Sequence, residues 1–167
     1  MTPCLSLEQI GAIAAERGLL LRLRAPQTLG LWRLQVGVAR SLGEGSAQLL
    51  GEMKGWALPL ASGLQLDTMR VQGQDTAGVG LLIWAATFAW ALESTPCRSA
   101  RLLAIRDGDR QHRRLVRYFE RLGFGPVREV GAGLTDLPLR LVWGGSGLLM
   151  RGDCAEGLER CGRLLSA

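Results

Sequence analysis

The chain has 167 residues, of which 47% are hydrophobic, which is enough for one core and too many for a disordered chain. Twenty basic residues against fifteen acidic ones give a net charge of +5, and a basic surface attracts anions such as phosphate-bearing coenzymes, acidic proteins and nucleic acid. The four cysteines form no CxxC pair and there is one histidine, so the sequence predicts reduced thiols, a cytoplasmic protein and no metal site.

The first half of the chain predicts one helix followed by an antiparallel run of strands. Ser6 and Gln9 fit a capping box, so we expect a helix over residues 7–17, with Gly18 as its stop signal. Short apolar or alternating segments predict strands over residues 19–24, 31–40, 48–60 and 64–71.

The second half begins with a long apolar segment. Residues 78–92 carry no charge, but these fifteen residues are fewer than the ~20 that a membrane span needs, so we expect a buried helix and no membrane span. Further along, the pattern predicts a strand ending at Ile105, a helix over 110–122, strands over 125–130 and 137–143, and a helix over 153–165. Without repeats or linkers, residues 1–167 are expected to form a single mixed α/β domain around one sheet.

The stretch D-T-A-G-V-G at residues 75–80 places two glycines at the start of the apolar helix. The first amides of a helix lack intrahelical acceptors and carry partial positive charge, and glycines let a pyrophosphate approach the backbone. A Walker loop requires Gly-Lys-Ser/Thr and a dinucleotide fingerprint requires glycine where Ile83 stands, so neither motif fits. Glycines that serve only helix–sheet packing are the alternative explanation.

A second segment, H-R-R-L-V-R-Y-F-E-R-L-G-F at residues 112–124, follows one predicted strand later. The first stretch resembles the Q/R-x-x-G-x-G/A element of the GCN5-related N-acetyltransferases (GNAT), and the second resembles their N-x-x-A-x-x-x-Y-x-x-x-G-F element. The resemblance covers about residues 64–143. It implies a GNAT-like, mainly antiparallel sheet flanked by helices and opened as a V between two central strands. It also implies transfer of an acetyl group from acetyl-CoA to an amine by direct attack.

The resemblance further implies a coenzyme site. The strand before the glycines, around Met69 and Val71, would bind the pantetheine. The pyrophosphate would bind the backbone amides of four consecutive residues, namely Ala77, Gly78, Val79 and Gly80. Phe119 falls at the position of the family's tyrosine and would line the coenzyme site, and the adjacent Tyr118 is the candidate general acid.

Three further residues are candidates for proton transfer. His112 stands at the family's asparagine position on the inward face of its helix, where a structural role, a hydrogen bond to the coenzyme and proton transfer all stay open. Glu52 and Asp67 are the carboxylates on the middle strands, and Glu52 is the candidate base. Either carboxylate also fits an ordinary solvated strand position.

Two departures from the family pattern bear on function. Asp75 stands where Gln or Arg is usual, and its carboxylate repels a pyrophosphate unless it caps the helix, which would stabilise the helix by about 1 kcal/mol. Only about six residues separate the first two predicted strands, where the family places two helices. The acceptor side is therefore expected to be shortened, or rebuilt by a partner or a second subunit.

The alternative hypothesis is a catalytically inactive GNAT-fold module that binds or assembles with a protein partner. Phe119, Asp75 and the shortened N-terminal part favour it, as do Trp32 and Trp143, which are expected to be exposed. The arginines of the helix over 110–122 lie opposite its apolar face and fit an acidic protein partner. No strand carries the paired aromatics of an RNA-binding sheet, which argues against nucleic acid. A small-molecule or protein amine acceptor and a homodimer both stay open.

Overall fold

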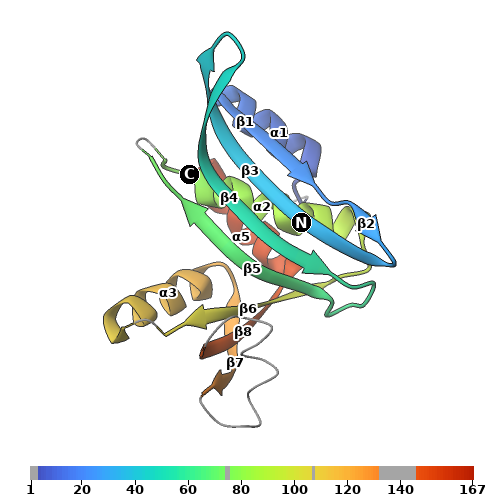
Figure 1. Ribbon diagram of the computed structural model, residues 1–167, viewed down its shortest axis with the longest axis vertical. Coiled ribbons are helices and arrows are strands. Elements are labelled where there is room, and N and C mark those ends of the chain that lie inside the picture. Colours follow the sequence, from blue (N-terminus) through green and yellow to red (C-terminus); the bar gives the residue numbers. More distant parts are fainter. Residues whose placement is uncertain (1–3, 74–75, 107, 132–145) are drawn as a thin grey trace.

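The computed structural model describes residues 4–73, 76–106, 108–131 and 146–167 (Figure 1). The described elements, in chain order, are α1 (Leu7–Glu16), β1 (Leu19–Arg24), β2 (Gln27–Thr28), β3 (Leu31–Gly43), β4 (Ser46–Ala57), β5 (Leu64–Val71), α2 (Val79–Ser94), β6 (Ser99–Ile105), α3 (Asp109–Arg121), β7 (Phe124–Val130), β8 (Gly147–Asp153) and α5 (Cys154–Ser166). One mixed sheet flanked by helices confirms the predicted fold class.

The sheet runs in the order β1-β3-β4-β5-β6-β8-β7, with β2 paired to β3. Every described pair of neighbours is antiparallel except β5 and β6, which are parallel. Their pairing joins Leu64–Leu66 to Ala100–Leu102 only, although β5 continues to Val71 and β6 to Ile105. Beyond the paired residues the two strands diverge (Figure 1), which is the V-shaped opening expected between two central strands.

Local signals explain where the first helix begins and ends. The Ser6 hydroxyl accepts a hydrogen bond from the Gln9 amide at 3.1 Å, and the Gln9 side chain accepts one from the Ser6 amide at 2.8 Å. This is the predicted capping box. After the helix, Gly18 takes a left-handed φ of 71°, a conformation that glycine adopts without steric cost.

The helix α2 carries apolar residues on every face, and most of these residues are buried. It packs against β3, β4 and β5 and against the helices α1 and α5, and Figure 1 shows the helices behind these strands. Beneath it lie fully buried strand residues, among them Val36, Val38, Leu50 and Met53. In the described part of the chain, no helix is long and apolar enough to cross a membrane.

Three sequence expectations need comment. The strand predicted over 137–143 and Trp143 lie outside the described residues, and the partner of β7 is instead β8, which the sequence pattern did not predict. The two-residue strand β2 was also missed. Trp32 was expected to be exposed, which is wrong: it packs on the core and meets Trp90 edge-on at a centroid distance of 6.4 Å.

Candidate functional site

Three predicted residues from three elements meet where β5 and β6 diverge. A β-carbon placed on Gly80, in the first turn of α2, would lie 3.1 Å from the Tyr118 hydroxyl of α3 and 3.4 Å from the Met69 methyl of β5. The absence of a side chain at Gly80 therefore allows a strand, a helix start and a tyrosine hydroxyl to come together.

The start of α2 presents backbone donors at this place. Gly78 precedes the helix with a left-handed φ of 79° and makes no side-chain cap. The Val79 amide donates to the Thr76 carbonyl at 3.1 Å and the Leu82 amide to the Gly78 carbonyl at 3.0 Å. Between them, the amides of Gly80 and Leu81 have no acceptor among the described residues, and the helix dipole adds partial positive charge here. An anion would find two free N–H groups.

An arginine that the sequence pattern did not reveal lies beside these donors. A β-carbon on Gly78 would lie 2.7 Å from Nη1 of Arg17, whose Nη2 donates to the Leu165 carbonyl at 2.9 Å. Arg17 is the C-cap of α1, so it reaches Gly78 only because α1 packs against α2. It adds a full positive charge to the partial charge of the helix start.

The Tyr118 hydroxyl is held as a proton donor. The buried indole of Trp84 donates its N–H to the hydroxyl oxygen at 2.9 Å. An indole N–H is a donor only, so the tyrosine accepts this bond and its own proton stays available. Burial raises the pKa of the Tyr118 hydroxyl, an effect that the Trp84 bond opposes. The group therefore stays protonated at neutral pH.

The neighbouring Phe119 has a different environment. Its ring meets Trp84 edge-on at a centroid distance of 6.0 Å and Phe124 at 6.1 Å, and the side chain is buried. One residue is about 100° of helix rotation, which separates the core-facing Phe119 from the hydroxyl-bearing Tyr118. The Tyr118 hydroxyl therefore lies next to Gly80 at the start of α2, whereas the Phe119 ring lies in the core.

The remaining proton-transfer candidates lie apart from this cluster. Nδ1 of the buried His112 lies 3.3 Å from the Ile105 carbonyl, where it joins the start of α3 to the end of β6. On β4, Met53 is in the core under α2 and Glu52, by strand alternation, points to the opposite face. The exposed Asp67 lies at an irregularity of β5 between the paired residues Leu66 and Thr68.

The other predicted coenzyme contacts differ in exposure. Val71 is exposed at the end of β5 and Ala77 is exposed just before α2, whereas the Val79 side chain is fully buried. Because Val79 has no exposed surface and its amide donates to the Thr76 carbonyl, it offers neither a side chain nor a free N–H to a ligand. Asp75 lies outside the described residues. Among the residues that the structure describes, no three His, Cys, Asp or Glu side chains gather as a metal site.

Comparison with known proteins gives limited similarity. No protein-family model matches the chain, and no curated protein matches it in sequence. One of the solved structures that it matches is a spermidine N-acetyltransferase SpeG chimera from Vibrio cholerae and hSSAT, with 12% identity over 80% of this chain and 71% of that chain and a TM-score of 0.47. A likeness at this level does not by itself assign an activity.

Proposed function

We propose that the protein is an acyl-CoA-dependent N-acyltransferase of the GNAT type, which transfers an acetyl group from acetyl-CoA to an amine by direct attack. The observation that carries the proposal is the divergence of the parallel strands β5 and β6 beside the start of α2. This arrangement offers an unpaired strand edge and a helix N-terminus to one extended, phosphate-bearing ligand.

The chain's own groups fit such a coenzyme. From Met69 to Val71, β5 pairs with β4 on one side only, so its other edge has N–H and C=O groups for the amides of a pantetheine. The free amides of Gly80 and Leu81, together with Arg17, would bind the pyrophosphate. Arg17 thereby supplies the positive charge that the sequence lacks at Asp75.

Acetyl-CoA, when bound, would supply the acetyl group as a thioester that an amine can attack. Tyr118 would hold a proton at its hydroxyl oxygen for the departing thiolate, in line with its raised pKa and its accepted bond from Trp84. Glu52 stays the proposed base, although it would have to act from the opposite face of the sheet, and His112 is a second candidate for proton transfer.

Titration calorimetry with acetyl-CoA and with coenzyme A tests the binding step. We expect both ligands to bind, and Gly80→Val to abolish binding because its side chain would enter the space of Tyr118 and Met69. No binding of either ligand at about 1 mM to the unmodified protein would contradict the proposal.

Release of free thiol with a panel of small amines and peptides tests the chemistry. Tyr118→Phe should lower kcat by roughly 10²-fold and leave the Kd of acetyl-CoA unchanged, because it removes the hydroxyl and keeps the ring. The variant also leaves the buried Trp84 N–H without its acceptor, so its folding is checked by circular dichroism first. Phe119→Leu is the matched control: it should lower stability through the aromatic cluster and leave kcat within about threefold. Equal losses of kcat in the two variants would exclude Tyr118 as the acid.

A catalytically inactive GNAT-fold module that binds a protein partner is the second candidate. The contacts of Glu52 favour this inactive module, because they occupy the carboxylate that would act as the base. The carboxylate accepts a hydrogen bond from Gln35 at 2.6 Å and lies 3.8 Å from the Lys54 ammonium. This candidate requires co-purification with one protein and no thiol release with any amine. Three buried, unpaired cysteines, Cys97, Cys154 and Cys161, support a reducing compartment such as the cytoplasm for either candidate. A homodimer also stays a proposal.

A further inference from the structure

The face of the sheet that points away from α2 is basic across six strands. On β4, Gly51 points at α2, since a β-carbon there would meet Val79 and Ile83, so the alternating Glu52, Lys54 and Trp56 point the other way. Residues paired across neighbouring strands lie on the same side of the sheet, so the register shows which residues of the other strands share this side. We call this side the open face. Its basic members are Arg22, Arg24, Arg33, Lys54, Arg70, Arg101 and Arg151.

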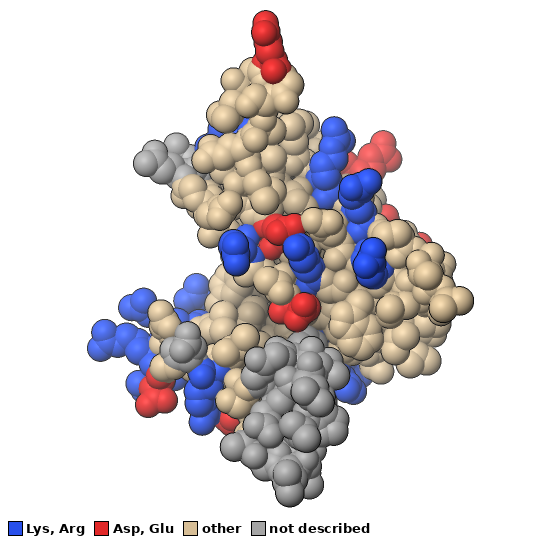
Figure 2. Space-filling view, in the orientation of Figure 1, with Lys and Arg blue, Asp and Glu red and all other residues tan. Residues whose placement is uncertain are grey.

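Acidic residues are few on the same strands. In β1, β3, β4, β5, β6 and β8 the acidic residues are Glu52, Asp67 and Asp153, and the Asp153 carboxylate accepts a hydrogen bond from the Glu156 amide at the start of α5. Figure 2 shows basic side chains, in blue, around a few acidic ones, in red, over the middle of the molecule in this view. The excess of positive charge on this face selects for an anionic ligand.

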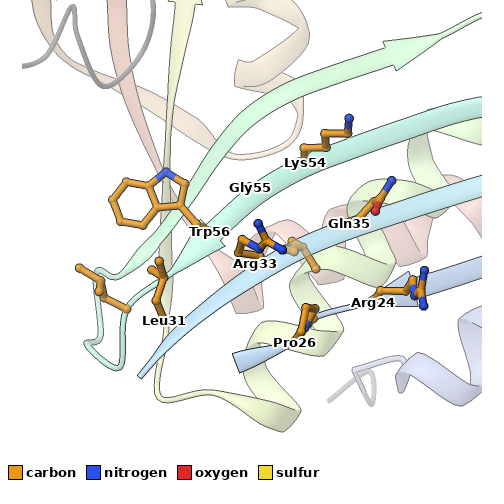
Figure 3. Close-up of a pocket in the computed structure, with 11 residues that line it drawn as sticks. Arg24, Pro26, Leu31, Arg33, Gln35, Lys54, Gly55 and Trp56 are labelled. Atoms are coloured by element: carbon orange, nitrogen blue, oxygen red, sulfur yellow. The ribbon is translucent and has the colours of Figure 1, made fainter. Parts of the chain in front are cut away.

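A groove with a partly apolar lining runs along the open face. Its volume is about 1140 Å³, between β1, β3 and β4. Figure 3 shows Arg24, Gln35 and Lys54 on neighbouring strands, with Arg33 and Trp56 towards the end of the groove near Leu31. The lining thus combines cationic groups with an indole and aliphatic carbon.

One arginine of the open face is incompletely satisfied. A single register row joins Arg33, Trp56, Gln65, Arg101 and Arg151 across five strands. Between Gln65 and Arg151 in this row, the buried Nε of Arg101 has no hydrogen-bond acceptor in the described part of the chain. A buried donor of a charged group without an acceptor is costly, and a carboxylate bound over the row would pair with the charge of the same guanidinium.

A strained, fully exposed leucine stands near the groove. Leu29 and Gly30 form the two-residue turn between β2 and β3, and Leu29 has a φ of 52°. This left-handed conformation costs a non-glycine residue about 1–2 kcal/mol, and the Leu29 side chain is 103% exposed. Asn-Gly is the preferred sequence for such a turn. A large apolar side chain kept in this position, close to the groove residue Leu31, indicates a contact with another molecule.

We propose that the open face docks an acidic polypeptide segment, whose carboxylates pair with the arginines and whose apolar side chains contact Trp56 and Leu29. A second copy meeting this face with its own would bring like charges together. A single-stranded nucleic acid would require successive aromatic side chains for base stacking, whereas Trp56 is the aromatic residue on the described part of this face. The proposal does not depend on acyl transfer.

The first test is fluorescence anisotropy at low salt with a labelled glutamate-rich peptide that contains leucines. The double variant Arg33→Gln/Lys54→Gln should weaken binding at least about tenfold. The control Arg113→Gln/Arg117→Gln removes the same charge from two exposed residues of α3 and should stay within about twofold. Equal or larger loss in the control would overturn the proposal, as would tighter binding of an oligothymidine of similar charge.

The second test separates docking from folding. Leu29→Asn should raise thermal stability, because asparagine tolerates the left-handed conformation, and still weaken peptide binding by about threefold or more. Trp56→Leu should weaken it by a similar factor. Unchanged peptide affinity in both variants would overturn the proposal. Acetyl-CoA binding, measured in parallel, should not change in either variant, so failure of this proposal is distinguishable from failure of the proposed enzyme activity.

Discussion

The same strands build two faces with opposite properties. On the covered face, Val36 and Met53 are fully buried beneath α2, whereas on the open face their alternating neighbours include Gln35 and Lys54, which line a groove. Because successive strand residues point to opposite sides, each strand serves the core with half of its residues. The other half is released from packing and is free to carry charge for recognition. Stability and binding should therefore respond to different substitutions.

The largest expected effect on stability comes from alkaline pH and arises from buried groups on the covered side of the sheet. Burial raises the pKa of the thiols of Cys154 and Cys161, both residues of α5, from 9.0 to about 12, and burial also raises the pKa of Tyr118. Above about pH 9 the unfolded chain loses thiol protons that the folded chain retains, so stability is complete below that pH and falls as pH rises toward 12. Each thiol contributes up to about 1.4 kcal/mol per pH unit.

Urea unfolding with reductant present, at several pH values above neutrality, measures this slope. Cys161→Ala should make it shallower, because one retained proton is removed from the folded state. An unchanged slope in Cys161→Ala would show that groups elsewhere cause the alkaline loss.

The next largest effect is expected from a core ring. Phe88 is fully buried, stacks on Trp84 at a centroid distance of 5.6 Å and lies 6.2 Å from Phe124. Phe88→Ala should lower the free energy of unfolding by about 3–5 kcal/mol, as measured by urea unfolding. The exposed Arg22 on the open face provides the comparison, since Arg22→Gln should change it by less than about 0.5 kcal/mol. Similar losses of unfolding free energy in Phe88→Ala and Arg22→Gln would mean that the open face also contributes to stability.

The fold was predictable from sequence where the signals are local. The capping box at Ser6, the apolar run of α2 and the alternation in β3 act within a few residues of each other, and their elements formed as expected. The strand β8 was missed because its short segment, Gly147–Asp153, shows no clear alternation; its burial comes from pairing with β6 and β7. Pairing between distant segments leaves no periodic pattern.

The site was predictable in part for the same reason. Met69, Gly80 and Tyr118 could be named because two motifs resemble those of the GNAT acetyltransferases, and the structure brings the three residues together. Arg17 and Trp84 could not, because their contacts with Gly78 and Tyr118 depend on how helices pack. On β1, Arg22 and Arg24 alternate visibly with apolar residues, but the alignment of Arg33, Arg101 and Arg151 into one row depends on register across strands.

A smaller change in stability is expected from substitutions at two glycines of α5 that have different neighbours. A β-carbon on Gly157 would lie 2.6–3.0 Å from the Phe88 ring, whereas one on Gly162 would lie 3.5 Å from a Leu5 methyl. Gly157→Ala should destabilise by about 1–3 kcal/mol through overpacking. Gly162→Ala, in ordinary contact, should stabilise by up to about 1 kcal/mol through helix propensity. Thermal unfolding of the two variants checks both signs, and stabilisation by Gly157→Ala would show that the covered side is loosely packed.

The smallest effect on stability is expected from Glu52, the carboxylate at the centre of the open face. Its ion pair with Lys54 spans 3.8 Å and both side chains reach solvent, so Glu52→Gln should change the free energy of unfolding by less than about 0.5 kcal/mol. The same variant should bind the glutamate-rich peptide about two- to threefold more tightly, since a repelling charge is removed. Weaker peptide binding would contradict the charge assignment of this face. Thiol release by this variant reports separately on Glu52 as a base: a loss of kcat would support that role, and an unchanged kcat would leave the residue to recognition alone.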